Sequence, residues 1–397
     1  MPNIEIRNLP VNPNPLALSD ILPVDPSATT TTVCNTVHDI VCAGPGNVAS
    51  GLNSRTEGAL NTASGAQSHA EGNNTIASAN NAHSEGTGTL ASGNAAHAEG
   101  NGTQATANEA HAEGINTIAN QGAAHAEGDG TTASGTDGSH AEGQGSTASG
   151  QASHAEGQFS IASAAGAHCE GGNSTASGIG SHAEGGTCVA SGNYSHAEGI
   201  QTTTGAVASH AEGFNSVTLS TAVQSHAEGN NSPCIGPSSH AGGVAGIGAN
   251  YNEWQRGIRD PSLTGTYTAY GIIGYGGATT NATPTEIFLD DNAATQRFVL
   301  YVPSTAAIYN VRVYVTAFGS AGVATFSGTG AITSVSGTVS LLATITMTQT
   351  GSSGTFSATS VTATADNVNK SLKITVTGIA ATNIKWVCRV DYDYIGL

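Results

Sequence analysis

The chain has 397 residues, a net charge of −18 and only 10 lysines and arginines, so we expect no nucleic-acid binding, which needs basic residues to displace counterions. Only three of its 19 aromatic residues (Phe159, Tyr194 and Phe214) precede residue 250, which excludes an ordinary core of large side chains there. No apolar run approaches the length of a membrane-spanning helix, and the first residues lack the basic start and apolar segment of a secretion signal, so neither membrane insertion nor secretion is expected.

Residues 1–45 are rich in proline and threonine, and their apolar residues come in short clusters. These clusters are Leu9-Pro10 and residues 20–24, 30–33 and 37–40. Prolines interrupt any helical or alternating period in this segment. We therefore predict an extended arm that becomes ordered against a partner surface.

A repeat of 14 residues follows, and residues 46–242 belong to it. Thirteen histidines recur from His69 to His240, and twelve of them open the tetrapeptide histidine, small residue, glutamate, glycine. Ten of the twelve steps between them are 14 residues long, and the other two are 15 and 16. The coil reads S-H-A-E-G-x-x-T-x-A-S-G, with two alternating runs each closed by glycine. This pattern predicts two short strands and two tight turns per coil, stacked into a shaft on the order of 60 Å long.

Alternation along each strand assigns the two faces of the coil. The residue after each histidine is alanine, serine or cysteine, as at Ala70, Ser84 and Cys169, and a coil this short has room inside only for such residues. Histidine and glutamate are then predicted to point outward. The sixth position after histidine points inward, which disfavours an ice-binding threonine face although threonines recur there, at Thr75, Thr89, Thr103, Thr117 and Thr131.

An apolar stripe is predicted on the outside of the second strand. The seventh position after histidine is apolar in half of the coils, at Ile76, Leu90, Ile118, Ile161, Val189 and Val217. An exposed apolar stripe along a thin solenoid indicates a partner surface, and several chains packed along their length would supply one.

The residue pattern of the chain changes after the repeat. Residues 243–266 are predicted to break the register and form a neck or linker, with Trp254, Arg256, Arg259 and Asp260. Residues 267–397 contain runs that alternate apolar with polar residues, such as residues 297–302, 310–318, 338–348, 371–377 and 384–394. Seven or eight such strands without a helical pattern predict an antiparallel β-sandwich, so the whole chain is expected to be all-β.

The six cysteines show no C-x-x-C spacing; they are Cys34, Cys42, Cys169, Cys188, Cys234 and Cys388. We interpret them as small buried apolar residues in a reducing compartment, in preference to disulfides or metal ligands.

Histidine and glutamate form two correlated columns on the predicted shaft. Between residues 51 and 242 there are sixteen acidic residues and one basic residue, Arg55, which takes the histidine position two residues before Glu57. Stacked carboxylates would repel one another unless donors lay between them. We favour a ladder in which each histidine donates to a glutamate of a neighbouring chain. Its named members are His69, Glu71, His83, Glu85, His97, Glu99, His111, Glu113, His154, Glu156, His182 and Glu184.

Two other interpretations of the columns stay open. The first is a solvated polar face, which is common on solenoids. The second is a divalent metal held by histidines that meet on a threefold axis, with His69, His83, His97, His111 and His125 as the candidates. No cofactor is expected.

The coil resembles the 14-residue repeat in the heads of trimeric autotransporter adhesins, in which a Ser-apolar-Ala-apolar-Gly strand alternates with a Ser-x-Ala-x-Gly strand. The resemblance covers about half of the chain and implies a left-handed parallel β-roll that trimerises. This chain departs from that family because histidine and glutamate hold the apolar positions.

The arm, with Leu9-Pro10, residues 20–24 and residues 37–40, looks like the virion-anchoring segment of bacteriophage tail fibres. The threonine-rich strands that end in Lys385-Trp386-Val387 are similar to the terminal domains of such fibres. Nothing after residue 243 looks like the stalk and membrane barrel of an autotransporter. The resemblance therefore implies a homotrimeric tail fibre made in the host cytoplasm, joined to tail or baseplate proteins through residues 1–45, that attaches the virion to a host receptor such as a glycan.

Two alternatives are a bacterial adhesin-type surface protein and a polysaccharide-cleaving tailspike, which needs paired carboxylates. The carboxylate candidates are Glu253, Asp260, Glu286, Asp290 and Asp291, but none lies in a motif and we expect no enzyme. Receptor contacts are expected on the loops and aromatic residues of the last domain, where Trp386, Tyr392 and Tyr394 are available. A place in the core or at a trimer seam is favoured for each of these three, so no binding residue is assigned.

Overall fold

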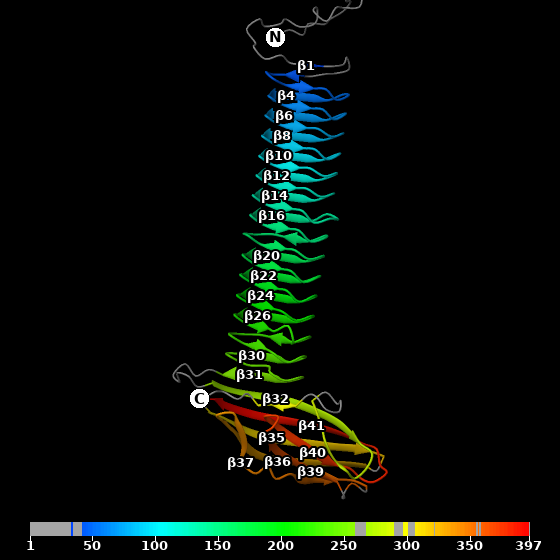
Figure 1. Cartoon of the computed structure of the whole chain (residues 1–397), viewed down its shortest axis with the longest axis vertical. Helices are drawn as coiled ribbons and strands as arrows, with labels where there is room; N and C mark the ends of the chain where they lie inside the picture. The colour runs from blue at the N-terminus through cyan, green and yellow to red at the C-terminus, as the bar shows by residue number, and fades with distance from the viewer. Residues whose placement is uncertain are drawn as a thin grey trace, which may run out of the picture.

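The computed structural model describes residues 33–34, 42–258, 267–289, 297–300, 306–320, 322–354, 356 and 359–396. These residues form a long parallel β-solenoid followed by antiparallel sheets, with no α-helix among them (Figure 1). The all-β prediction and the solenoid are thereby confirmed. Most of the predicted arm lies outside the described residues.

One face of the solenoid is a parallel sheet of fifteen two-residue strands. They are β1 (Val33–Cys34), β3 (Val48–Ala49), β5 (Thr62–Ala63), β7 (Ile76–Ala77), β9 (Leu90–Ala91), β11 (Gln104–Ala105), β13 (Ile118–Ala119), β15 (Thr132–Ala133), β17 (Thr147–Ala148), β19 (Ile161–Ala162), β21 (Thr175–Ala176), β23 (Val189–Ala190), β25 (Thr203–Thr204), β27 (Val217–Thr218) and β29 (Pro233–Cys234).

The opposite face carries the histidines and glutamates. Its strands are β2 (Cys42–Ala43), β4 (Arg55–Ala59), β6 (His69–Asn73), β8 (His83–Thr87), β10 (His97–Asn101), β12 (His111–Ile115), β14 (His125–Asp129), β16 (His140–Gln144), β18 (His154–Ala155), β20 (His168–Gly172), β22 (His182–Gly186), β24 (His196–Ile200), β26 (His210–Phe214), β28 (His226–Ala227) and β30 (His240–Gly243).

Pairing in both sheets joins equivalent residues of successive coils. His97 pairs with His111 and Glu99 with Glu113, and the insertion before His140 leaves the register intact because His125 still pairs with His140. The repeat also begins earlier than predicted, since Val33 pairs with Val48 and Cys42 with Thr56. Like residues therefore stack on like residues along the whole shaft.

The interior of the shaft is narrow and filled by small side chains, as predicted. The alanines that follow the histidines, such as Ala70 and Ala98, are fully buried. The threonines at the sixth position after histidine, such as Thr75 and Thr117, are buried as well. Some buried polar groups pair between coils: the Thr75 hydroxyl donates to Asn61 Oδ1 at 2.9 Å, and the Ser160 hydroxyl donates to that of Ser146 at 3.1 Å. The Thr117 hydroxyl has no such partner. Satisfied polar ladders of this kind take the place of large apolar side chains.

Steric constraints require glycine at the last position of the repeated tetrapeptide. Gly185 has a φ of +103°, and a Cβ placed on it would lie 2.2 Å from the carbonyl oxygen of Gly199 in the next coil. Only glycine adopts that φ readily and tolerates such an approach of two backbones. Where serine precedes the histidine it also has a local role, since the Ser68 hydroxyl donates to the Gly65 carbonyl at 2.8 Å and closes the turn.

The repeat register continues beyond residue 242, contrary to the predicted neck. Strand β31 (Trp254–Ile258) pairs in parallel with β30, so Trp254 stacks below His240 and Arg256 below Gly242. This coil was not predicted from the sequence because tryptophan replaces histidine and arginine replaces glutamate there, although the 14-residue step is kept. Residues 259–266 lie outside the described part of the chain.

The sheet that carries the histidines runs on into the last domain without a break. Strand β31 pairs with β32 (Tyr267–Thr279), which is followed edge to edge by β41 (Ile384–Gly396), β35 (Ala306–Gly319) and β36 (Gly322–Val335). Strands β37 (Thr338–Ala343) and β38 (Thr348–Ser352) pair with successive parts of β36. These contacts are antiparallel, as predicted for this domain.

A second antiparallel sheet covers the inner face of the first. Its central strand β40 (Ser371–Thr377) pairs with β39 (Ser360–Asp366) on one side and with β33 (Pro284–Glu286) and β34 (Phe298–Val299) on the other. The two sheets enclose one hydrophobic core, in which Val313 and Trp386 of the first sheet join Leu372 and Ile374 of the second.

We predict that Gly185→Ala lowers the free energy of unfolding by about 3 kcal/mol, because the new Cβ combines an unfavourable φ with a backbone clash. Urea denaturation followed by circular dichroism measures the effect. Gly172→Ala is the matched control, since its Cβ would meet nothing within 4 Å and its φ is not positive. Equal losses in the two variants would contradict the steric explanation.

Candidate functional site: the histidine and glutamate columns

The candidate site is the pair of columns on the outer face of the longer strands. We call the thirteen stacked histidines from His69 to His240 the His column, and the thirteen glutamates from Glu57 to Glu228 the Glu column. Their side chains point outward while the alanine between them points inward, as predicted from alternation. The paired histidine side chains are 29–36% exposed, so they are neither buried nor fully solvated in one chain.

The imidazole rings of the His column stack face to face. Successive ring centroids are 4.6–4.9 Å apart, and most ring pairs are within 15° of parallel. The last pair, His226 and His240, opens to 22°. The twelve steps together give a column about 57 Å long, which agrees with the predicted length of the shaft.

The two columns contact each other within a single chain. In the first nine coils that show the pair, histidine Nε2 lies 3.5–3.7 Å from the glutamate two residues on, as in His69–Glu71 and His154–Glu156. Nε2 also approaches the glutamate of the preceding coil in His69, His182 and His196. In the last three histidines the contact with the preceding coil takes the place of the own-coil contact, at 3.5 Å in His226–Glu212. The predicted pairing of histidine with glutamate is thus present inside one chain, while its inter-chain form stays a prediction.

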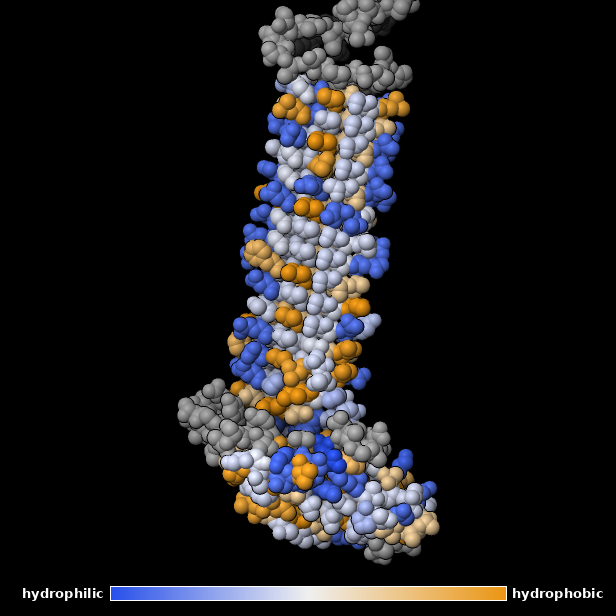
Figure 2. Space-filling model, in the orientation of Figure 1, coloured by the Kyte–Doolittle hydropathy of each residue, from blue (hydrophilic) through white to orange (hydrophobic). Residues whose placement is uncertain are grey.

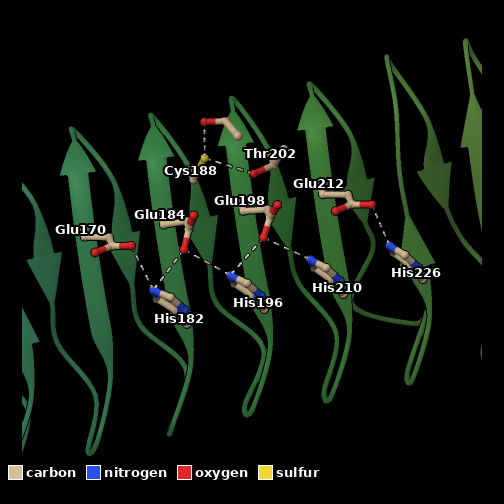
Figure 3. A network of polar contacts seen from close by, with 11 residues as sticks. Glu170, His182, Glu184, Cys188, His196, Glu198, Thr202, His210, Glu212 and His226 are labelled. Carbon is tan, nitrogen blue, oxygen red and sulfur yellow. Dashed lines mark hydrogen bonds and ion pairs between the residues drawn. The ribbon is translucent and has the colours of Figure 1, made fainter.

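Figure 3 shows how these contacts alternate along the shaft. His182 Nε2 lies 3.8 Å from Glu170 and 3.7 Å from Glu184. Glu184 in turn lies 3.9 Å from His196, which also contacts Glu198 at 3.7 Å. The carboxylates and imidazoles therefore form a short zigzag chain in which Glu184 and Glu198 each reach two rings.

The Nε2 atoms of all thirteen histidines are buried and have no hydrogen-bond partner. The carboxylate contacts are too long or too poorly directed for hydrogen bonds, although they are within ion-pair distance. A buried polar nitrogen without a partner costs free energy, and this arrangement is repeated in thirteen coils.

The pKa of several column histidines is lowered. For His97, His140, His182, His210 and His240 the largest cause is desolvation, followed by the charge of the neighbouring imidazoles, and the nearby glutamates oppose the shift. Glu170 has a raised pKa because of desolvation and its neighbour Glu184. Neutral imidazoles are therefore favoured at neutral pH in these coils.

Both ends of the His column are closed by other residues. Arg55 pairs in register with His69 at the first coil, as predicted from the sequence. At the other end the Trp254 ring meets His240 edge on at 6.0 Å and then packs against Tyr270 at 5.4 Å. The rings of the column are thus covered where the shaft joins the last domain.

The buried Glu253 joins the coil of β31 to the last domain, residues 267–397, which we call the head. Its carboxylate accepts hydrogen bonds from the Ala249 and Asn250 amides at 2.7 and 2.8 Å, and from the Asn250 side chain. The Tyr392 hydroxyl of β41 donates to its other oxygen. Burial raises the pKa of Glu253, while these donors oppose the shift. Its role in the structure is therefore to join the shaft to the head.

Of the other carboxylates suggested for catalysis, Glu286 alone lies in the described part of the chain. Glu286 is held by Arg297 at 2.9 Å and Lys373 at 3.8 Å, whereas Asp260, Asp290 and Asp291 lie outside the described residues. Cys169, Cys188, Cys234 and Cys388 are free and buried, as expected, and burial raises the pKa of Cys169 to about 11. The side chains of Cys34 and Cys42 lie outside the described part.

The aromatic residues suggested for receptor contact are in the core. Trp386, Tyr392 and Tyr394 are at most 6% exposed. The exposed aromatics of the described head are instead Tyr314 and Phe318, on the outer face of β35. Sequence reasoning missed them, although the valines at 311, 313 and 315 mark the inner face and so place residue 314 outside.

Apolar side chains do recur on the outside of the shaft (Figure 2). Ile76 and Ile161 of the predicted stripe are about 40% exposed. Further apolar residues lie exposed at the turns and strand ends, including Ile115, Tyr194, Ile200 and Phe214. The shaft therefore presents apolar surface in addition to the two polar columns.

Comparison with known proteins adds no relative. No protein-family model and no curated protein matches the chain. Among the described residues there is no helix long and apolar enough to cross a membrane.

We predict that the shaft loses stability as the pH falls below about 6.5. A histidine whose pKa is lower in the folded chain binds its proton more readily in the unfolded chain, so its contribution is complete above 6.5 and is lost as the pH falls toward the folded-state pKa. Glu170, whose pKa is raised, acts in the opposite direction and from a lower pH range. Thermal unfolding in chelator-containing buffer at pH 7 and pH 5 measures the difference.

The control for this pH effect replaces His182, His210 and His240 with glutamine, which does not titrate. A smaller fall in melting temperature is expected for that variant than for the wild type. A melting temperature that does not change between pH 7 and pH 5 in the wild type would contradict the prediction.

Proposed function

We propose that the chain is the fibre protein of a phage tail, a homotrimer whose shafts pack along the His and Glu columns and whose last domain attaches the virion to the host cell surface. The repeat resembles that of trimeric adhesin heads, and on this resemblance the shaft is a left-handed roll. The arm, which resembles virion-anchoring segments, is the end that joins tail or baseplate proteins.

The observation that carries the proposal is the incomplete His column. Thirteen buried Nε2 atoms on one side of a rigid shaft lack hydrogen-bond partners, and twelve of them, all but that of His168, are near a carboxylate that they contact only at ion-pair distance. A neighbouring chain in the same register would bring a second set of carboxylates and imidazoles to this side. Each histidine would then donate to a glutamate of the next chain, and the seam would be completed in every coil at once.

The exposed apolar residues support close packing of neighbouring chains. Ile115, Ile200 and Phe214 lie two residues after a column glutamate, on the same strands and the same outward side. Burying such residues against a second chain would add favourable hydrophobic free energy, about 25 cal/mol for each Å². In such a seam the polar ladder would set the register of the chains, and the apolar residues beside it would add to the affinity between them.

The elongated shape of the shaft is that expected of a fibre, in which a long spacer holds two functional ends apart. A solenoid in which every coil pairs with the next resists bending, and it places the last domain at the far end from the N-terminal coils (Figure 1). The outer face of that domain carries Tyr314 and Phe318, which are available to a surface ligand. The shaft thus acts as a spacer.

We expect light scattering after size exclusion to give three times the 39.3 kDa of one chain at neutral pH. The physical reason is that one chain alone leaves the whole column unsatisfied. A monomeric mass would overturn the shaft packing, the ladder and the fibre together.

We also expect an antibody against residues 267–397 to label the tails of the virus that encodes the chain and to slow its adsorption to cells. Labelling is checked by electron microscopy, and adsorption by counting free virus. An antibody against an unrelated virion protein is the control. Labelling of a bacterial surface in the absence of virions would favour an adhesin instead.

A further inference from the structure

The shaft surface has the charge of a cation-binding surface. Sixteen acidic residues and one arginine lie between residues 51 and 242, and thirteen of the acidic residues form the Glu column beside the imidazoles. A lone pair on Nε2 directed at a carboxylate is repulsive unless a proton or a metal ion lies between them.

The distances fit a metal ion better than a proton. In nine coils Nε2 lies 3.5–3.7 Å from the carboxylate oxygen of the same coil, which is beyond a normal hydrogen bond. Two ligands of a tetrahedral zinc ion, each bound at about 2.0–2.2 Å, stand about 3.4 Å apart. The pair therefore accommodates one ion with a shift of a few tenths of an ångström.

A second carboxylate completes the ligand set in the coils of Figure 3. His182 has Glu170 and Glu184 at 3.8 and 3.7 Å, and His196 has Glu184 and Glu198 at 3.9 and 3.7 Å. Each set offers one imidazole nitrogen and two carboxylate oxygens, which leaves one position for water. These donors suit zinc and its neighbours among the divalent transition metals.

Neighbouring histidines do not share one ion. Their ring centroids are 4.6–4.9 Å apart, and the ligand atoms of groups such as His69, Glu71 and His83 lie within 4.8 Å of one another. Two nitrogens bound to one zinc ion stand at most about 4.2 Å apart, so two stacked rings would have to approach each other to share an ion. Each site is therefore centred on a single histidine. Since adjacent sites share a glutamate and adjacent ions repel each other, we expect occupation of about every other coil.

We propose that the His and Glu columns bind divalent transition-metal ions such as Zn²⁺, each held by Nε2 of one histidine and by carboxylate oxygens of its own coil and the preceding coil. The unpartnered Nε2 atoms are the ligands that no other group of the chain uses. All ligands of a site come from one chain, so the proposal goes beyond the fibre function and does not depend on it. In a coil that holds an ion, Nε2 binds the ion in place of a glutamate of the next chain, and the histidines of unoccupied coils stay available to the seam.

The test is equilibrium dialysis of the full-length protein against Zn²⁺ at pH 7.5. We expect several ions bound per chain in the wild type. The triple variant Glu170→Gln, Glu184→Gln and Glu198→Gln is expected to lose two or more of them, because it removes the carboxylates from three successive coils. Circular dichroism checks that the variant is folded.

A matched control removes the same charge elsewhere on the shaft. Glu109→Gln, Asp129→Asn and Asp137→Asn change three acidic residues that belong to neither column, and this variant is expected to bind as many ions as the wild type. Equal losses in both variants would show diffuse attraction to an acidic surface and overturn the proposal. Less than one ion per chain in the wild type would also overturn it.

Co²⁺ provides a second readout, because the intensity of its visible absorption distinguishes a four-coordinate site from the hydrated six-coordinate ion. We expect strong bands in the wild type and in the control variant, and weaker bands in the column variant. A wild-type spectrum identical to that of hydrated cobalt would contradict coordination by the columns. A trimeric mass without bound metal would leave the fibre proposal standing and reject this one.

Discussion

The close stacking of successive coils is the constraint on which the rest of the structure depends. A coil of 14 residues has space inside for alanine, serine and threonine only, and the glycine of each coil nearly touches the backbone of the next. Stability therefore comes from backbone pairing, buried small residues and interior hydroxyl ladders, not from large apolar side chains. Every larger or ionisable side chain is forced outward as a consequence.

This constraint also creates the electrostatics of the shaft. Because equivalent residues of successive coils pair in register, the histidine rings stack 4.6–4.9 Å apart and the glutamates of successive coils are neighbours on adjacent strands. Like groups at that distance are unfavourable in isolation, and the two columns moderate each other by alternating in a zigzag. In this arrangement the Nε2 atoms are buried and have no hydrogen-bond partner. Both the proposed seam between chains and the proposed metal sites use these atoms.

The junction with the last domain follows from the same sheet. Strand β31 keeps the step of the repeat but changes its residues, so Trp254 closes the ring stack and Glu253 accepts a hydrogen bond from Tyr392 of the head. The sheet of the head thus continues the sheet of the shaft through the pairing of β31 with β32. Its outer face, with Tyr314 and Phe318, continues the side of the sheet on which the columns lie.

The sequence by itself determined the solenoid, its inward and outward faces and the place of the two columns, because a fixed period with alternating small residues allows few other structures. It also indicated the antiparallel strands of the last domain. Only the tertiary structure decided that the repeat continues to Trp254, since a side-chain pattern does not report backbone register once its residues change. Likewise, burial of Trp386 and Tyr392 and the in-chain contact of histidine with glutamate depend on packing between strands distant in sequence.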